Sequence, residues 1–379
     1  MRRFWLLLAV IGVLVTFTGP VGAQGDGDES RYYLAALAYD DGYEISDARL
    51  FAIAPDGTQA DYFGNMNFPI TTSLIQFGIA ATASDGPWLV AIMTGAGTTE
   101  AATYGGSGEV LGSLEEYGID LAFLIAWPDD RTLVYWGYQG GIPTLIRYDL
   151  DTAELGFAPL PEGASDPRFF ALSPDYESVL APLDDDTAAI WPLGDYETPL
   201  AEIDITFPWW QTFAAYPAWS PDGTYIAFAA YPDDEPGPIP VMYDVATGEV
   251  RQIAEMQCEV REACLPVHFA WSPDGARLAY WEEALSNTGP DALLVYDIAT
   301  GEAHDYPDAV SYPASLTWSP DGRTLAYRWS YEMDGTFNDI IMIDTETGNV
   351  SRFGFGLDTV QIIGWLHTPE IIPASEDAK

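Results

Sequence analysis

Carboxylates in short runs are the residues of this chain best suited to chemistry. An aspartate or glutamate can act as a general acid or base, can help to hold Ca²⁺, and can attract a cationic partner. These activities need several carboxylates that converge, so the fold must bring the runs together. The candidate ligand- or partner-binding carboxylates are Asp184, Asp185, Asp186, Asp233, Asp234, Glu235, Glu282 and Glu283.

Two adjacent tryptophans form a second candidate group. Trp209 and Trp210 lie in the segment PWWQTF, residues 208–213. An indole face can hold a sugar ring or a cationic group, and exposed aromatic pairs often mark binding surfaces. The pair could instead cap a seam between packed sheets, and the sequence leaves both interpretations open.

Signatures of catalysis are scarce. The segment nearest to the nucleophile motif G-x-S-x-G is GGSGE, residues 105–109, which fails at its last position. No phosphate-binding glycine loop or EF-hand spacing occurs. Of the three histidines, His268 and His367 fall on expected inner strands and His304 does not, so an axial metal is conceivable, but a packed imidazole is the ordinary explanation. We expect no catalytic residue, and Ca²⁺ is the one cofactor that the carboxylates suggest.

The charge of the chain restricts its partners. Acidic residues number 58 and basic residues 14, which gives a net charge of −44 at pH 7. A surface of this kind repels nucleic acid and anionic lipid. We therefore expect a protein, peptide or carbohydrate partner and no nucleic acid. A solubilising acidic coat, or adaptation to salt, would produce the same composition.

The first residues predict export. Arg2 and Arg3 precede an apolar stretch that is shorter than the roughly 20 residues of a spanning helix, and Val-Gly-Ala resembles a cleavage site. We predict a signal peptide over 1–23, a flexible acidic stub over 24–31, a folded domain over 32–373 and a disordered tail over 374–379. The mature chain would be secreted or periplasmic, without a transmembrane segment. In that setting Cys258 and Cys264 predict a disulfide.

A repeated turn organises the elements that must position these residues. In SLTWSPDGRTLAYRW, residues 315–329, the proline presets φ and the glycine supplies a left-handed conformation, so two strands meet at a tight turn. The segment DIIMIDTETGNV, residues 339–350, adds a third strand, a turn and the start of a fourth. One copy predicts a four-stranded meander. The tryptophans of the repeat, Trp219, Trp271 and Trp318, are expected to wedge between neighbouring sheets.

The repeat recurs every 44 to 52 residues. Such a period with four strands in each copy predicts a β-propeller. The acids at the turns are Asp85, Asp129, Asp175, Asp222, Asp274 and Asp321.

The two ends of the chain complement each other. The segment VQIIGWLHTPEII, residues 360–372, predicts one innermost strand, and YYLAALAYDDG, ARLFAIAPDGTQ and ADYF near the N-terminus predict three further strands. Their pairing would leave no open sheet edge between first and last repeats. We predict an all-β fold, a monomeric seven-bladed β-propeller of four-stranded antiparallel blades, with the last blade closed by the N- and C-terminal strands.

The predicted blades separate the acidic runs from the axis. The expected innermost strands, IAATAS, LAFLIAW, RFFALS, YPAWS, VHFAWS, SLTWS and QIIGWLH, contain no aspartate or glutamate. An acid–base pair on those strands would be needed for glycosidase chemistry at the axis. The acidic runs instead fall in loops opposite the S-P-D-G turns, where they would form a rim.

The turn W-S-P-D-G, residues 271–275, and the downstream Y-D-x-x-T-G-E, residues 296–302, resemble the TolB-type propeller repeat, a relative of the WD repeat. The resemblance covers nearly all of 32–373. It implies the architecture and leaves function open, because the same repeat occurs in periplasmic TolB, in the propellers of prolyl oligopeptidases and in exported proteins of unknown role. TolB also has a separate N-terminal α/β domain, and we expect no such domain in the residues before Tyr32.

These observations predict an exported, non-catalytic scaffold that binds a protein or ligand through an acidic rim flanked by aromatic side chains. Two alternatives stay open. One is a hydrolase or lyase that acts on a carbohydrate in the rim loops, and the other is a TolB-like component of the cell envelope.

Overall fold

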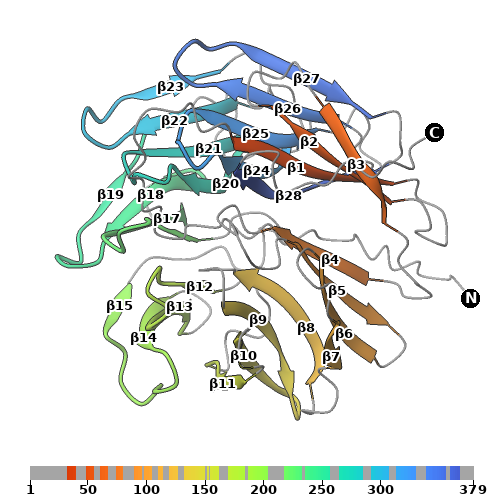
Figure 1. Ribbon diagram of the computed structural model, residues 1–379. Helices are drawn as coiled ribbons and strands as arrows, with labels where there is room; N and C mark the ends of the chain where they lie inside the picture. Colours follow the sequence, from red (N-terminus) through yellow and green to blue (C-terminus); the bar gives the residue numbers. More distant parts are fainter. Residues whose placement is uncertain are drawn as a thin grey trace, which may run out of the picture.

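The computed structural model describes the strands and many of their connections. The described residues are 32–39, 48–54, 60–66, 74–79, 89–95, 98–104, 110–113, 119–126, 132–149, 152, 154–161, 170–183, 187–203, 217–232, 235–256, 264–284, 292–306, 313–329, 339–355 and 359–367. The predicted signal peptide, acidic stub and C-terminal tail lie outside them. Every regular element within them is a β-strand, and the strands form four-stranded sheets (Figure 1).

Six sheets each consist of four strands that follow one another in the chain, paired as antiparallel meanders. They are β4 (Leu74–Ile79), β5 (Leu89–Gly95), β6 (Thr98–Tyr104) and β7 (Val110–Ser113); β8 (Ile119–Ala126), β9 (Thr132–Gln139), β10 (Ile142–Asp149) and β11 (Leu155–Pro159); β12 (Ala171–Leu172), β13 (Ser178–Pro182), β14 (Ala188–Pro192) and β15 (Ala201–Ile203); β16 (Ala218–Trp219), β17 (Tyr225–Ala230), β18 (Ile239–Asp244) and β19 (Val250–Gln252); β20 (Cys264–Trp271), β21 (Arg277–Ala284), β22 (Ala292–Asp297) and β23 (Ala303–Asp305); β24 (Pro313–Trp318), β25 (Thr324–Trp329), β26 (Asp339–Asp344) and β27 (Val350–Gly354).

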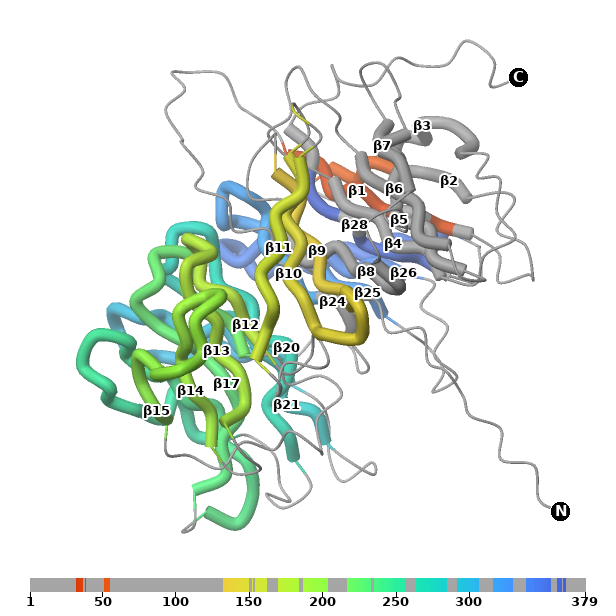
Figure 2. The backbone as a smooth tube through the Cα atoms, turned by 90° about the horizontal axis from the view of Figure 1, so that it is seen from below, coloured from red at the N-terminus to blue at the C-terminus, as the bar shows by residue number. Residues whose placement is uncertain are grey.

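A further sheet joins both ends of the chain. It consists of β28 (Thr359–His367), β1 (Tyr32–Tyr39), β2 (Ala48–Ile53) and β3 (Ala60–Met66) in that order. Strand β1 pairs antiparallel with β28 from Tyr32 opposite His367 to Tyr39 opposite Thr359, and both views show the two strands side by side (Figures 1 and 2). The predicted pairing of the chain ends is confirmed. The sheet that the repeat count predicts as the seventh blade is thus composite, whereas the other six are continuous units of the chain.

The first strand of each consecutive sheet, and β28 in the composite one, lies innermost. Inner strands of neighbouring sheets contact one another, as β16 contacts β20 and β20 contacts β24. The core is divided among the seams between sheets, and one apolar cluster joins the sheet of β20–β23 to that of β24–β27. The all-β propeller predicted from the repeat is confirmed at this level.

The repeated tryptophans connect neighbouring sheets. The indole Nε1 of Trp219, Trp271 and Trp318 donates a hydrogen bond to a backbone carbonyl in the inner strand of the preceding sheet, at 3.1, 2.9 and 2.9 Å. The three side chains are between 4 and 8 % exposed. Each indole fills a seam and also satisfies its one polar group there, as expected for a buried tryptophan. The prediction that these tryptophans wedge between sheets is confirmed.

Candidate binding surface at the loop end

The hairpin turns divide the propeller into two ends. The turn end holds the S-P-D-G turns, between first and second strands, and the D-x-x-T-G turns, between third and fourth strands. The loop end holds the connections from second to third strands and those from one sheet to the next. The sequence assigns the predicted site residues to the loop end, and the structure describes three of them: Glu235, Glu282 and Glu283.

At the turn end, the S-P-D-G turns are closed by their own side chains. Ser272 Oγ donates to Asp274 Oδ1 at 2.5 Å and accepts from the backbone N–H of Arg277 at 2.9 Å. Gly275 has φ +69°, which a residue with a Cβ rarely adopts. The same arrangement recurs with Ser220 and Asp222, with Ser319 and Asp321, and with Ser173 and Asp175.

The D-x-x-T-G turns also use their aspartates internally. Asp297 Oδ1 accepts from the backbone N–H of Thr300 at 2.7 Å, and Asp244 and Asp344 accept the same bond in their own sheets. Hydrogen bonds to an ionised carboxylate favour that form. The backbone N–H of Thr300 accordingly lowers the pKa of Asp297, and the hydroxyl of Ser173 lowers the pKa of Asp175.

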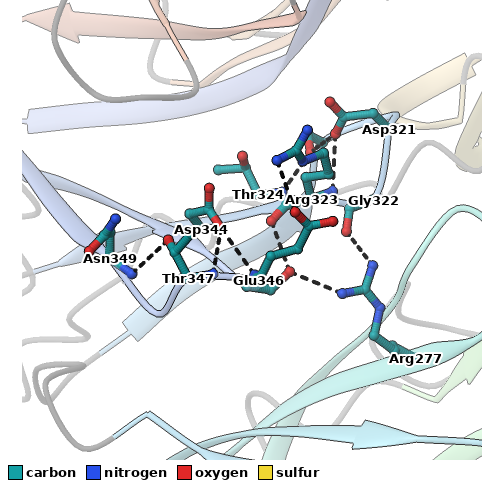
Figure 3. Close-up of polar contacts among 11 residues, drawn as sticks. Arg277, Asp321, Gly322, Arg323, Thr324, Asp344, Glu346, Thr347 and Asn349 are labelled. Atoms are coloured by element: carbon teal, nitrogen blue, oxygen red, sulfur yellow. Dashed lines mark hydrogen bonds and ion pairs between the residues drawn. The ribbon is translucent and has the colours of Figure 1, made fainter.

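Arginines fasten the turns of one sheet to the sheet before it. Arg277, at the start of β21, donates from Nη2 to the carbonyl of Gly322 at 2.5 Å and from Nη1 to Thr345 Oγ1 at 3.0 Å (Figure 3). Its guanidinium also lies 4.8 Å from the ring centre of Trp318.

A second arginine makes the same connection from a different strand. Arg147 in β10 donates from Nη2 to the carbonyl of Tyr176 at 2.6 Å, and Tyr176 occupies the turn position that Gly322 has in its sheet. The sequence analysis missed both arginines. The signal that could have found them is that basic residues are few, so those next to a turn motif are conspicuous.

The predicted rim carboxylates meet different environments at the loop end. Glu235 is exposed in the connection from β17 to β18, and Glu283 is partly exposed near the end of β21. The other predicted members of the rim lie outside the described residues: Asp184, Asp185, Asp186, Asp233, Asp234, Trp209 and Trp210. The sequence places Asp184–Asp186 between β13 and β14, and Asp233 and Asp234 directly before Glu235.

The prediction that Glu282 is an exposed carboxylate of the rim is wrong. Its side chain is 0 % exposed, because β21 continues to Ala284 and keeps Glu282 in register between Pro266 of β20 and Ala292 of β22. Two residues along a strand return to the same face, so Glu282 lies on the face of the buried Tyr280. Burial raises the pKa of the Tyr280 phenol, and the charge of Glu282 raises it further.

An arginine neutralises one carboxylate of the loop end that the sequence analysis did not single out. Arg352 Nε donates to Asp339 Oδ2 at 2.5 Å, and its guanidinium packs 3.8 Å from the ring centre of Trp329. Gly354 leaves room for this pair, since a Cβ there would lie 2.9 Å from Asp339 Oδ1. Asp339 therefore belongs to an internal ion pair and does not add to an open acidic rim.

The structure describes one of the two cysteines of the predicted disulfide. Cys264, the first residue of β20, is disulfide-bonded. Cys258, the one other cysteine of the chain, lies outside the described residues.

The inner strands are poor in acids but not free of them. Strand β8 begins at Ile119, so it includes Asp120, and the expectation of no carboxylate on an inner strand is wrong at that residue. Within the described parts of the chain, no three His, Cys, Asp or Glu side chains gather as a metal site would require. His268 and His367 lie on the inner strands β20 and β28, whereas His304 lies on the outer strand β23 and contacts the ring of Tyr306.

Known proteins share the fold of this chain at low sequence identity. No family model and no curated protein matches it. A putative 6-phosphogluconolactonase from Bacteroides uniformis is 16% identical over 87% of this chain and 99% of its own, with a TM-score of 0.51. An oligogalacturonate lyase in complex with manganese is 15% identical over 86% and 85%, with a TM-score of 0.51. TolB from Acinetobacter baumannii is 15% identical over 89% and 67%, with a TM-score of 0.47.

These similarities establish the propeller scaffold and no particular function. Protein pairs at such identity share an architecture on which unrelated activities are built. In the described part of the chain, no helix is both long and apolar enough to cross a bilayer.

Proposed function

We propose that this chain is an exported, non-catalytic propeller that binds a cationic protein or peptide at its loop end. The observation that carries the proposal is the different distribution of charged residues at the two ends. At the turn end, the aspartates close their own turns. The loops from second to third strands hold thirteen acidic residues and no Lys, Arg or His.

Charge of one sign in adjacent loops has a physical consequence. The loops around one end of a propeller are neighbours, so their fields add and attract a cationic group before contact. Glu235 is an exposed, described member of these loops, and Glu283 lies close to the loop that follows β21. The sequence places Trp209 and Trp210 between β15 and β16, and indole faces there would add surfaces over which a cation can pack.

A carbohydrate hydrolase or lyase is the second candidate. Two observations favour it: Asp120 lies on an inner strand, and the oligogalacturonate lyase has the same scaffold. An enzyme needs a carboxylate whose replacement abolishes turnover while the fold survives. Replacing Asp120 by asparagine in a chain that degrades an oligosaccharide would reveal that role. A role like that of TolB in the envelope is a special case of the binding proposal, and would appear as co-purification with an envelope protein.

The binding proposal is tested with charge-matched variants. The loop-end variant carries Asp184→Asn, Asp185→Asn and Asp186→Asn. The turn-end variant carries Glu154→Gln, Glu249→Gln and Glu302→Gln, three exposed acids whose side chains close no turn. Both lose three negative charges, so any effect of net charge is equal. The probe is a lysine- and arginine-rich peptide, and the measurement is its dissociation constant at low and at physiological salt.

The loop-end variant is expected to bind roughly tenfold more weakly, because each exposed ion pair contributes up to about 1 kcal/mol. The turn-end variant should bind like the unmodified chain. Equal weakening in both variants would mean that the peptide senses only net charge, and would overturn the proposal. A saturable response to Ca²⁺ that survives high salt and is lost in the loop-end variant would identify the same carboxylates as a calcium site.

A further inference from the structure

The hydroxyl of Tyr280 is a buried polar group that the described part of the chain leaves without a hydrogen-bond partner. Tyr280 lies in the second strand of its sheet, β21, and is 0 % exposed. Within the residues that the structure describes, its Oη makes no hydrogen bond. About nine in ten buried polar groups of native proteins are hydrogen-bonded, either to protein or to ordered water. The phenol therefore needs a partner from outside these residues.

The ring of Tyr280 is packed in a seam between two sheets. It belongs to the apolar cluster that joins the sheet of β16–β19 to that of β20–β23, and the neighbouring sheet contributes Ala227 and Met242 to this cluster. The ring is also stacked on Phe269 of β20, with ring centres 5.7 Å apart and ring planes 25° apart. Because side chains from both sheets surround the ring, the phenol cannot turn out to bulk water unless the seam opens.

A carboxylate lies near the phenol but does not contact it. Glu282 follows Tyr280 by two residues along β21, so both side chains lie on the same face of the sheet, and Glu282 is also 0 % exposed. Burial raises the pKa of Tyr280, and the charge of Glu282 raises it further, so the two groups are within electrostatic reach. No hydrogen bond joins them. Polar groups that are close without direct contact are typical partners of a bridging water.

The inner strand bulges directly opposite Tyr280. The register of β20 with β21 shifts between Val267 and Ala270, so two residues, His268 and Phe269, lie opposite one. His268 has φ +56°, a left-handed value that interrupts the extended strand. A bulge takes one residue out of the hydrogen-bond ladder. A backbone polar group is thus present in addition to the two side chains, and a buried water needs two to four such partners.

We propose that one water molecule is bound in this seam, where it accepts a hydrogen bond from the Tyr280 hydroxyl and donates one to the carboxylate of Glu282. Glu282 has other interactions in the fold, and the proposal does not need it to be free, because an ionised carboxylate accepts up to about four hydrogen bonds. The water would satisfy the phenol and help to solvate a buried charge. The proposal is independent of the loop-end function, because it uses no exposed carboxylate.

Two other aromatic residues provide the comparisons for a test. Phe228 is the fourth residue of β17, as Tyr280 is of β21, and it is buried without a hydroxyl. A phenylalanine therefore fits this position of a sheet, and Tyr280→Phe should fold. Tyr306 donates from its hydroxyl directly to the carbonyl of Thr345 at 3.1 Å. Tyr306→Phe is thus the reference for the loss of a hydroxyl that is bonded to protein.

The first test is a high-resolution crystal structure of the full mature chain. The expected result is an ordered water within hydrogen-bond distance of both Tyr280 Oη and a carboxylate oxygen of Glu282. The same water should be lost or displaced in a crystal of Tyr280→Phe. A Tyr280 hydroxyl that bonds directly to a protein group, or that has no water beside it, would overturn the proposal.

The second test is urea unfolding in solution. The unfolding equilibrium constant of Tyr280→Phe should be roughly fivefold larger than that of the unmodified chain, because the variant loses a net hydrogen bond. Tyr306→Phe should show a loss of similar size. A hydroxyl buried without any partner would give the opposite sign, since its removal relieves the cost of burying it. An unfolding constant that is unchanged or smaller in Tyr280→Phe would therefore overturn the proposal.

Discussion

The turn end and the loop end of this propeller differ in how acidic and basic residues are distributed. At the turn end, each described turn aspartate accepts backbone or hydroxyl hydrogen bonds, and arginines tie one sheet to the next. At the loop end, the second-to-third-strand loops concentrate acids without a basic residue among them. The difference teaches that acidic composition alone does not locate a surface. What matters is where the acids lie in the fold and whether basic residues lie in the same loops.

The largest effect is expected where the turn end meets the core. Trp318→Ala would remove a buried indole, its bond to the carbonyl of Ala270, and the surface on which Arg277 packs. A buried large-to-small change of this type costs about 3–5 kcal/mol. Urea unfolding should show this loss, whereas Trp318→Phe should lose less because it keeps most of the packing. A loss below about 1 kcal/mol for Trp318→Ala would mean that the seams do not carry the stability of the fold.

His268 lies on an inner strand, and its protonation should make the stability of the fold depend on pH. Its pKa in the folded chain, about 4, is below the value of 6.5 for an unperturbed histidine. The unfolded state therefore binds a proton first, so the stability from the neutral imidazole is complete above pH 6.5 and is lost as the pH falls toward 4. The difference in unfolding free energy between the unmodified chain and His268→Asn should shrink by on the order of 2 kcal/mol across this window. A difference that stays constant with pH would contradict the lowered pKa of His268.

The left-handed turn glycines should be sensitive to a methyl group. Gly322 has φ +71°, and a Cβ there would lie 3.4 Å from Nη2 of Arg277. Gly322→Ala should destabilise the chain by about 1–2 kcal/mol, through backbone strain and displacement of the arginine. Gly156 on β11 has an ordinary φ and is the control, since Gly156→Ala should stay within about 0.5 kcal/mol. Thermal unfolding of the two variants would separate these outcomes.

The smallest effects on stability are expected from replacing two arginines at the turn end. Arg277→Lys would lose the planar guanidinium that bonds Gly322 and Thr345 together, at a cost of about 1 kcal/mol. Arg323 pairs with Glu346 at 2.9 Å, but both side chains are more than half exposed, so Arg323→Lys should change stability by less than about 0.5 kcal/mol. Equal losses of unfolding free energy in the two variants would show that the contacts of Arg277 between sheets stabilise the fold no more than the exposed ion pair of Arg323 does.

Local motifs predicted the architecture because each repeat encodes its own turn. The S-P-D-G hairpins, the wedged tryptophans and the pairing of the chain ends follow from turn chemistry, strand alternation and the need to close a sheet edge. The composite sheet could be predicted because the C-terminal segment lacks the partners that the N-terminal segments supply.

The site was harder to predict because strand ends are set by tertiary packing. Glu282 looked like part of a loop, yet β21 extends past it and buries its side chain. The two-residue alternation through Leu278 and Tyr280 places Glu282 on a buried face. A charged residue is typical of an exposed loop, so its type predicts the opposite. Asp120 was missed for the same reason, since β8 starts before the apolar run that marked the strand. The arginine contacts join residues far apart in sequence, which no local motif encodes.

The most direct test of the difference between the two ends is the unfolding free energy of two charge-matched variants in urea. One replaces Asp222, Asp274 and Asp321 by asparagine, and the other replaces Asp184, Asp185 and Asp186. The first should lose roughly 3 kcal/mol, because each turn loses charge-assisted hydrogen bonds. The second should stay within about 0.5 kcal/mol or gain slightly as repulsion falls. An equal loss in both variants would contradict the account, because the loop-end carboxylates would then stabilise the fold as much as the turn aspartates do.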